Sequence, residues 1–115
     1  MIQRGQVVLF PFPHTNQTKS KLRPALVIEK NPGRYDDWLI CMISSQLHHE
    51  VKDFDEILWE ADSDFPQSGL KTTSLIRLGR LAVVDRQILV GTIGQVGSER
   101  LIRIKDRIAG WIKGT

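Results

Sequence analysis

Short apolar runs, separated by polar or proline- and glycine-containing stretches, fill most of the chain up to residue 97. Each run has the length of a β-strand, and several alternate apolar with polar positions, as strands with one buried face do. The pattern predicts strands over residues 6–12, 24–29, 38–44, 73–84 and 88–96, and an edge strand over residues 57–61. Between them it predicts loops over residues 14–22 and 65–71 and a turn over residues 85–87.

The C-terminal segment has a different period. Its apolar residues recur at the three- and four-residue spacing of a helix that buries one face: Leu101, Ile104, Ile108 and Trp111. Ser98 can cap this helix, which we predict over residues 99–113, and Trp111 is expected to anchor it on the sheet. Strands followed by one terminal helix predict a mainly β fold, a small and strongly bent sheet or barrel that the helix covers.

The composition is that of an ordinary globular protein. With 115 residues, 41% of them hydrophobic and 25% charged, the chain is expected to form a single domain over residues 1–115. Its one cysteine, Cys41, cannot form an intrachain disulfide and lies in an apolar run, where a buried thiol is expected. No apolar run is long enough to cross a bilayer and no signal-peptide core opens the chain, so we expect a cytosolic protein without a membrane contact.

Positive charge is concentrated in a few clusters. The formal net charge of +3 and the isoelectric point near 9.3 are compatible with a polyanionic partner but do not require one. Lys19, Lys21 and Arg23 gather in and after the loop over residues 14–22. Pro24 restricts Arg23 to an extended conformation at the start of a buried strand, where a guanidinium suits a phosphate.

A second group of polar side chains lies on other predicted strands, where a sheet can bring them close to Arg23. They are Ser44, Ser45 and Gln46 at the end of the strand over residues 38–44, and Ser74 and Arg77 on the strand over residues 73–84. Each also has a structural explanation. Ser44 could hydrogen-bond the backbone at its strand end, and Arg77 could form a surface ion pair.

Other common functional arrangements fit the sequence poorly. His48 and His49 are adjacent, so in extended structure they point to opposite faces, and no second ligand pair follows at zinc spacing. We therefore expect no metal and no cofactor. Gly91, Gly94 and Gly97 do not form a phosphate-binding loop and instead indicate bends or close backbone approach. No strand-to-helix elbow surrounds any serine.

Several segments together match a known pattern. The most specific is Arg23-Pro24 after a polar loop, within residues 21–28. The others are the opening at residues 4–12, the strand end at 41–44, residues 74–78 and 81–85, and residues 93–96 leading into the last helix. In this order they resemble the PemK/MazF toxins of bacterial toxin–antitoxin pairs, over almost the whole chain.

This resemblance implies a compact SH3-like barrel with a C-terminal helix, and a homodimer that cuts single-stranded RNA without a metal. It implies that the 2′-hydroxyl of the RNA attacks the adjacent phosphorus, leaving a 2′,3′-cyclic phosphate and a free 5′-hydroxyl. The family's catalytic arginine and catalytic hydroxyl fall on Arg23 and Ser44. Such a toxin arrests growth when its cognate antitoxin, a protein that folds over the RNA groove, is lost.

On this interpretation Arg23 stabilises the charge that builds on the phosphate oxygens, and Ser44 donates a hydrogen bond that orients the phosphate. Lys19 and Lys21 would hold neighbouring phosphates and make the affinity sensitive to salt. The remaining RNA-binding candidates supply polar groups or aromatic rings for contacts to the chain and its bases: His14, Ser45, Gln46, His48, His49 and Ser74.

The sequence departs from some relatives at one position. Those relatives carry an arginine and, two residues later, an aspartate proposed as the general base. Arg77 matches the arginine, but Gly79 occupies the second position. A histidine of near-neutral pKa could take its place, and His14 and His48 are the closest to the motif in sequence. Alternatively, positioning of the phosphate suffices and no dedicated base exists.

Two other functions stay open at this point. The same barrel serves in toxins that poison DNA gyrase through their C-terminal helix and tail, and the chain would then be a non-catalytic binding protein. A second alternative is an inactive relative that only binds an antitoxin. Arg23 and Ser44 give no sign of degeneration and favour the nuclease.

Overall fold

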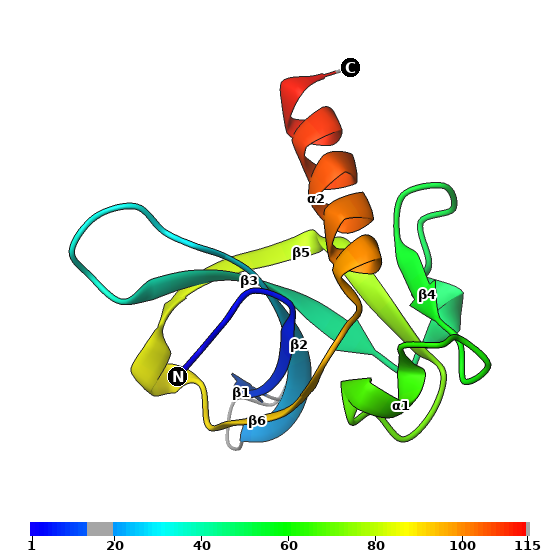
Figure 1. Cartoon of the computed structure of the whole chain (residues 1–115), viewed down its shortest axis with the longest axis horizontal. Coiled ribbons are helices and arrows are strands. Elements are labelled where there is room, and N and C mark those ends of the chain that lie inside the picture. The colour runs from blue at the N-terminus through cyan, green and yellow to red at the C-terminus, as the bar shows by residue number, and fades with distance from the viewer. Residues whose placement is uncertain (14–19, 115) are drawn as a thin grey trace.

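A computed structural model describes residues 1–13 and 20–114 of the chain (Figure 1). In this part of the chain, one antiparallel sheet has the strand order β4-β5-β3-β2-β1-β6. The strands are β1 (Gln6–Pro13), β2 (Ser20–Lys30), β3 (Asp37–Ser44), β4 (Glu56–Leu58), β5 (Ser74–Asp85) and β6 (Gly91–Gln95). The helical elements are the turn η1 (Leu47–His49), α1 (Phe65–Ser68), the turn η2 (Arg86–Ile88) and α2 (Ser98–Lys113). The predicted mainly β fold with a C-terminal helix is confirmed.

The sheet is curled into a half-barrel (Figure 1). It buries apolar side chains on both faces. Because side chains alternate along a strand, neighbours such as Leu26 and Val27 point to opposite faces. The first core cluster lies under α2 and includes Val7, Leu26, Cys41, Ile43, Ile76, Leu78, Ile104 and Ile108. The second lies on the other face and includes Val8, Ala25, Val27, Trp38, Ile40 and Val84. The central strand β3 contributes to both clusters, which is why its apolar run is nearly continuous.

The start of β2 differs from the prediction. Residues up to Arg23 were expected to lie in or at the edge of a loop, but β2 already begins at Ser20. It pairs there with the end of β1, and Arg23 lies opposite Phe10. Arg23 is therefore inside a strand and not at its start. Its backbone is fixed both by the pairing of β2 with β1 and by Pro24.

The structure also differs from the prediction in β4, in residues 65–71 and in β6. The edge strand β4 ends before Trp59, because the backbone N–H of Trp59 donates to the Asp62 carboxylate at 2.9 Å and the chain turns. Part of the predicted loop over residues 65–71 is the short helix α1. The strand predicted over residues 88–96 is shortened to β6, because the backbone N–H of Leu89 still donates to the carbonyl of Arg86 in the η2 turn.

Helix α2 buries the face that its period predicts, except at its end. Ile104 and Ile108 are buried against the sheet. Ser98 does not cap the helix: the cap position is Gly97, and Ser98 is the first helical residue. Trp111 is 52% exposed and forms a T-shaped pair with the Phe54 ring, with 5.3 Å between ring centroids, so it does not anchor α2 on the sheet. No helix in the described ranges is both long and apolar enough to cross a membrane.

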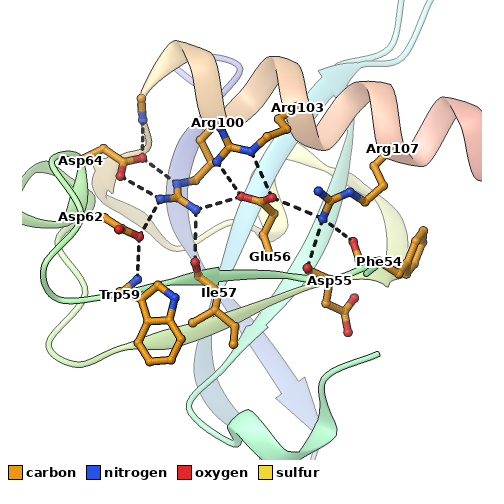
Figure 2. Close-up of polar contacts among 11 residues, drawn as sticks. Phe54, Asp55, Glu56, Ile57, Trp59, Asp62, Asp64, Arg100, Arg103 and Arg107 are labelled. Atoms are coloured by element: carbon orange, nitrogen blue, oxygen red, sulfur yellow. Dashed lines mark hydrogen bonds and ion pairs between the residues drawn. The ribbon is translucent and has the colours of Figure 1, made fainter. Parts of the chain in front are cut away.

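A largely buried ionic network ties α2 to β4 and to the turn that follows β4 (Figure 2). The guanidinium of Arg100 donates to both carboxylate oxygens of Asp64, to Glu56, to Asp62 and to the carbonyl of Ile57. Arg103 also donates to Glu56, and Arg107 lies 3.3 Å from the same carboxylate. Glu56, Asp62 and Asp64 therefore neutralise the arginines of α2.

Close backbone packing joins α1 to β6. A Cβ atom on Gly94 would lie 2.3 Å from the carbonyl oxygen of Gln67, and one on Gly69 would lie 2.0 Å from the carbonyl oxygen of Ile93. Gly69 also has a φ of 75°, which side chains disfavour. The predicted close approach is thus found at Gly94, whereas a Cβ atom on Gly91 would meet open space.

Candidate active site

A cleft of about 630 Å³ opens on the face of the sheet away from α2. Its floor contains Phe10, Met42 and Ala82, which pack against the second core cluster. Polar and charged side chains from four elements line it: Arg23 on β2, Ser44 on β3, Gln46 and His49 in and before η1, and Arg77 and Arg80 on β5. The cleft therefore combines an apolar floor with three guanidinium groups.

The strand register explains why Arg23, Ser44 and Arg77 converge. β2 and β3 pair Ala25 with Met42, and continuing that register by two residues places Arg23 level with Ser44. β3 and β5 pair Met42 with Arg77. Side chains at paired or alternate positions share one face of a sheet. The side chains of Arg23, Ser44 and Arg77 therefore lie on three adjacent strands and on the same face.

A bulge in β5 adds Arg80 to the cleft. Cys41 pairs with Leu81 and the next residue, Met42, pairs with Arg77, so residues 78–80 have no partner on β3. Such bulges bend a strand and redirect its side chains. The buried carboxylate of Asp55 supports this one by accepting the backbone N–H of Leu78 at 3.0 Å. Arg77 and Arg80, on either side of Gly79, both reach the cleft as a result.

Ser44 keeps its hydroxyl proton available. Its Oγ accepts the backbone N–H of Gln46 at 3.0 Å, which is the strand-end hydrogen bond that the sequence left open. This bond occupies one lone pair of the hydroxyl and leaves the O–H group as a donor. The structural explanation and the donor role are therefore compatible, because the backbone bond fixes the oxygen that would hold a phosphate.

His49 lies in the cleft, whereas His48 does not line it. The two were expected to point to opposite faces of an extended chain, but they occupy the η1 turn and their ring centroids lie 4.3 Å apart. Desolvation and then the nearby His48, Arg77 and Arg80 lower the pKa of His49. The imidazole that faces the arginines is therefore neutral at physiological pH.

The other predicted residues are placed differently. Lys21 and Ser45 are exposed but do not line the cleft. Ser74 is buried and its hydroxyl donates to the carbonyl of Thr72 at 2.8 Å, so it has a structural role away from the cleft. His14 and Lys19 lie outside the described residues.

Sequence reasoning missed Arg80 and the apolar floor. Arg80 was not among the predicted site residues, since nothing in the pattern predicts the bulge. The sequence also allowed a surface ion pair for Arg77. Among the residues that the structure describes, Arg77 forms no ion pair with an acidic side chain. Its guanidinium faces the cleft instead.

Other potential sites offer less chemistry. Cavities of about 290 and 540 Å³ lie along α2, but the arginines that line them already pair with Glu56, Asp62 and Asp64. Cys41 is fully buried, and this burial raises the pKa of its thiol to about 12, which makes it a poor nucleophile. Within the described residues, no three histidine, cysteine or acidic side chains are grouped to hold a metal.

Comparison with known proteins agrees with this fold. The model of the family described as PemK-like, MazF-like toxin of type II toxin–antitoxin system matches residues 3–112. This chain therefore belongs to the PemK-like, MazF-like toxin family. A comparison with curated proteins found no match.

Proposed function

We propose that the protein is a sequence-selective endoribonuclease that cuts single-stranded RNA, including messenger RNA, and that a cognate antitoxin neutralises it. The observation that carries this proposal is the shared cleft in which the register sets Arg23 level with Ser44. A fixed guanidinium beside a hydroxyl donor is a suitable site for a phosphodiester. Membership of a type II toxin family supplies the antitoxin as the expected partner.

The proposed reaction needs no group from outside the RNA to attack the phosphorus. The 2′-oxygen forms a bond to phosphorus while the bond to the 5′-oxygen breaks, which gives a 2′,3′-cyclic phosphate and a 5′-hydroxyl. Negative charge builds on the non-bridging oxygens during this step. Arg23 stabilises that charge and Ser44 donates a hydrogen bond to one of the oxygens, a kind of contact whose loss typically lowers the rate roughly 100- to 1,000-fold.

The rest of the cleft fits the flanking nucleotides. Arg77 and Arg80 hold an adjacent phosphate, because the two guanidinium groups, one just before the β5 bulge and one in it, match the charge of the RNA backbone. The apolar floor around Phe10 and Met42 accepts a base, and Gln46 supplies an amide that can read its edge. We further propose that the active form is a homodimer, as the family implies.

Cleavage of a defined RNA tests this proposal. Purified protein is incubated with single-stranded RNA in EDTA, and sequencing of the ends locates the cuts and identifies the cyclic phosphate. Arg23→Ala should lower the rate at least roughly 100-fold. Arg34→Ala is the matched control, since it removes the same charge from an exposed turn, where Arg34 hydrogen-bonds the Tyr35 hydroxyl and stacks on the Tyr35 ring, away from the cleft. Its rate should equal that of the unmodified protein.

Two results would contradict the proposal. Full activity of Arg23→Ala would remove Arg23 from the site. Intact RNA with the unmodified protein, together with stalled topoisomerase in a gyrase assay, would support a binding protein in place of a nuclease. The thermal unfolding of each variant confirms that a loss of cleavage is not a loss of fold.

A further inference from the structure

The proposed reaction releases a proton that some group must accept. The 2′-hydroxyl loses this proton as its oxygen bonds to phosphorus, and a positioned base typically accelerates such a step roughly 100- to 10,000-fold. Gly79, two residues after Arg77, has no side chain that could accept this proton. The proton acceptor has therefore to be sought among the other residues of the cleft. This inference rests on the proposed function.

The described lining of the cleft contains one group that can take up a proton near neutral pH. Arg23, Arg77 and Arg80 are permanently cationic and have no acceptor. The hydroxyl of Ser44 and the amide of Gln46 are not basic. The other lining residues are apolar, and no aspartate or glutamate is among them. This leaves the imidazole of His49.

We propose that His49 is the general base of this endoribonuclease. Its imidazole nitrogen accepts the proton of the 2′-hydroxyl as the 2′-oxygen bonds to phosphorus. The bond from phosphorus to the 5′-oxygen breaks, and the departing oxygen takes a proton from solvent water. His49 then returns its proton to solvent, so that the enzyme is unchanged and the RNA ends as a cyclic phosphate and a free hydroxyl.

The position of η1 supports this role. The turn follows directly on β3, whose last residue is Ser44, so the imidazole and the catalytic hydroxyl are separated by a short and ordered stretch of backbone. The backbone N–H of Gln46 donates to Ser44 and that of His49 donates to the carbonyl of Gln46. Two consecutive hydrogen bonds thus fix His49 relative to the group that orients the phosphate.

The charges around His49 favour the form that a base requires. The neighbouring groups are His48 in its own turn, Arg77 and Arg80 on β5, and Arg23 across the cleft on β2. Desolvation, followed by His48 and the two β5 arginines, lowers the pKa of His49, so the ring is unprotonated at neutral pH. His48 shares the turn but does not line the cleft, so it cannot replace His49 without a rearrangement.

Steady-state kinetics on a short RNA with the identified cut site test the assignment between pH 5 and 9. His49→Gln should lower kcat roughly 100-fold, with a KM within about threefold of the unmodified protein. It should also remove the acidic limb of the pH profile, where protonation of His49 inactivates the enzyme. Glu50→Gln is the control, because Glu50 is exposed, follows His49 in the chain and does not line the cleft. This variant should keep the unmodified kcat and the acidic limb of the pH profile.

Two further measurements separate a base from other roles. An RNA with sulfur in place of the 5′-bridging oxygen has a leaving group that needs no proton. His49→Gln should stay roughly 100-fold slower on it, because a base is still missing. With His49→Ala, added imidazole should restore cleavage in proportion to its unprotonated form, which also controls for a variant that is only misfolded.

The outcomes are distinct. If His49→Gln cleaves within threefold of the rate of the unmodified protein, His49 is not the base. The same holds if His48→Gln loses cleavage and His49→Gln does not. In both cases Arg23→Ala still tests the proposed nuclease activity separately. A defect that disappears with the sulfur-containing RNA makes His49 an acid and overturns the assignment as well. If the unmodified protein cuts no RNA, the proposed function and this inference fail together.

Discussion

Replacing Arg100 by methionine tests how much the ionic network under α2 stabilises the fold. Arg100 is only 8% exposed and donates to three carboxylates and one carbonyl (Figure 2). Methionine keeps most of the aliphatic volume and removes the charge. The substitution destabilises the Asp64 carboxylate most. Its side chain is only 12% exposed, and the backbone N–H of Gly97 is the one hydrogen-bond donor from another residue that it retains.

The size of the stability loss depends on which hydrogen-bond and ion-pair partners each of the three acids retains. Breaking a buried ion pair on one side typically costs about 3–5 kcal/mol. Glu56 keeps Arg103 and Arg107, and the side chain of Asp62 is 32% exposed and can be hydrated. The loss should therefore lie at the lower end, about 3 kcal/mol in the free energy of unfolding. For a domain of this length that corresponds to a fall of roughly 12 °C in Tm.

Urea denaturation and thermal melting followed by circular dichroism measure this loss. Arg103→Met is the matched control, because the Arg103 side chain is 48% exposed and should contribute at most about 1 kcal/mol. Adding Asp64→Asn to Arg100→Met should recover part of the stability, since it removes the carboxylate left without its partner. An Arg100→Met protein that melts within 2–3 °C (roughly 0.5 kcal/mol) of the unmodified one would refute the reasoning.

Three other predictions follow from buried or paired groups. Asp55→Ala leaves two backbone N–H groups, at residues 51 and 78, without their acceptor. Urea denaturation should show a loss of about 2–4 kcal/mol, and RNA binding should weaken as the β5 bulge shifts, with smaller effects for Asp55→Asn. Hydrogen bonds from Lys105, which is the strongest, from the backbone of Lys30 and from Arg4 lower the pKa of Glu29 from 4.5 to about 2 against the opposing effect of desolvation. Because the folded value is the lower one, this stability is complete above about pH 4.5 and is lost as the pH falls towards 2. The unfolding free energy should drop between pH 5 and 3 and drop less in Glu29→Gln. Cys41 should react with a thiol reagent only after denaturation, and rapid labelling of the native protein would contradict its burial.

The fold was largely predictable because its signals are local. Strand-length apolar runs, the prolines and glycines between them, and the helical period of the last segment each depend on neighbouring residues only. Boundaries failed where a distant partner decides them. β2 begins as early as Ser20 because its first residues pair with β1. Residues 65–68 form the helix α1, which packs closely against the backbone of Gly94.

The candidate site was predictable in part for the same reason. Arg23 and Ser44 could be proposed from a motif and a strand end, and the register sets them level in one cleft. The choice between His48 and His49 depended on a local conformation that the sequence does not encode strongly. An extended chain would have pointed them to opposite faces, whereas the η1 turn leaves only His49 in the cleft.

The β5 bulge shows why Arg80 and the apolar floor could not be found from a strand pattern. A regular strand places alternate residues on one face, so Arg77 and Ala82 would point in opposite directions. Residues 78–80 break that alternation: Arg77 pairs with Met42 and Ala82 pairs with Ile40, and both face the cleft. A shift of an odd number of residues exchanges the faces of everything beyond it. The chain thereby keeps Leu78 in the core under α2, opens Gly79 and Arg80 to solvent, and sets two guanidinium groups on one side of a strand.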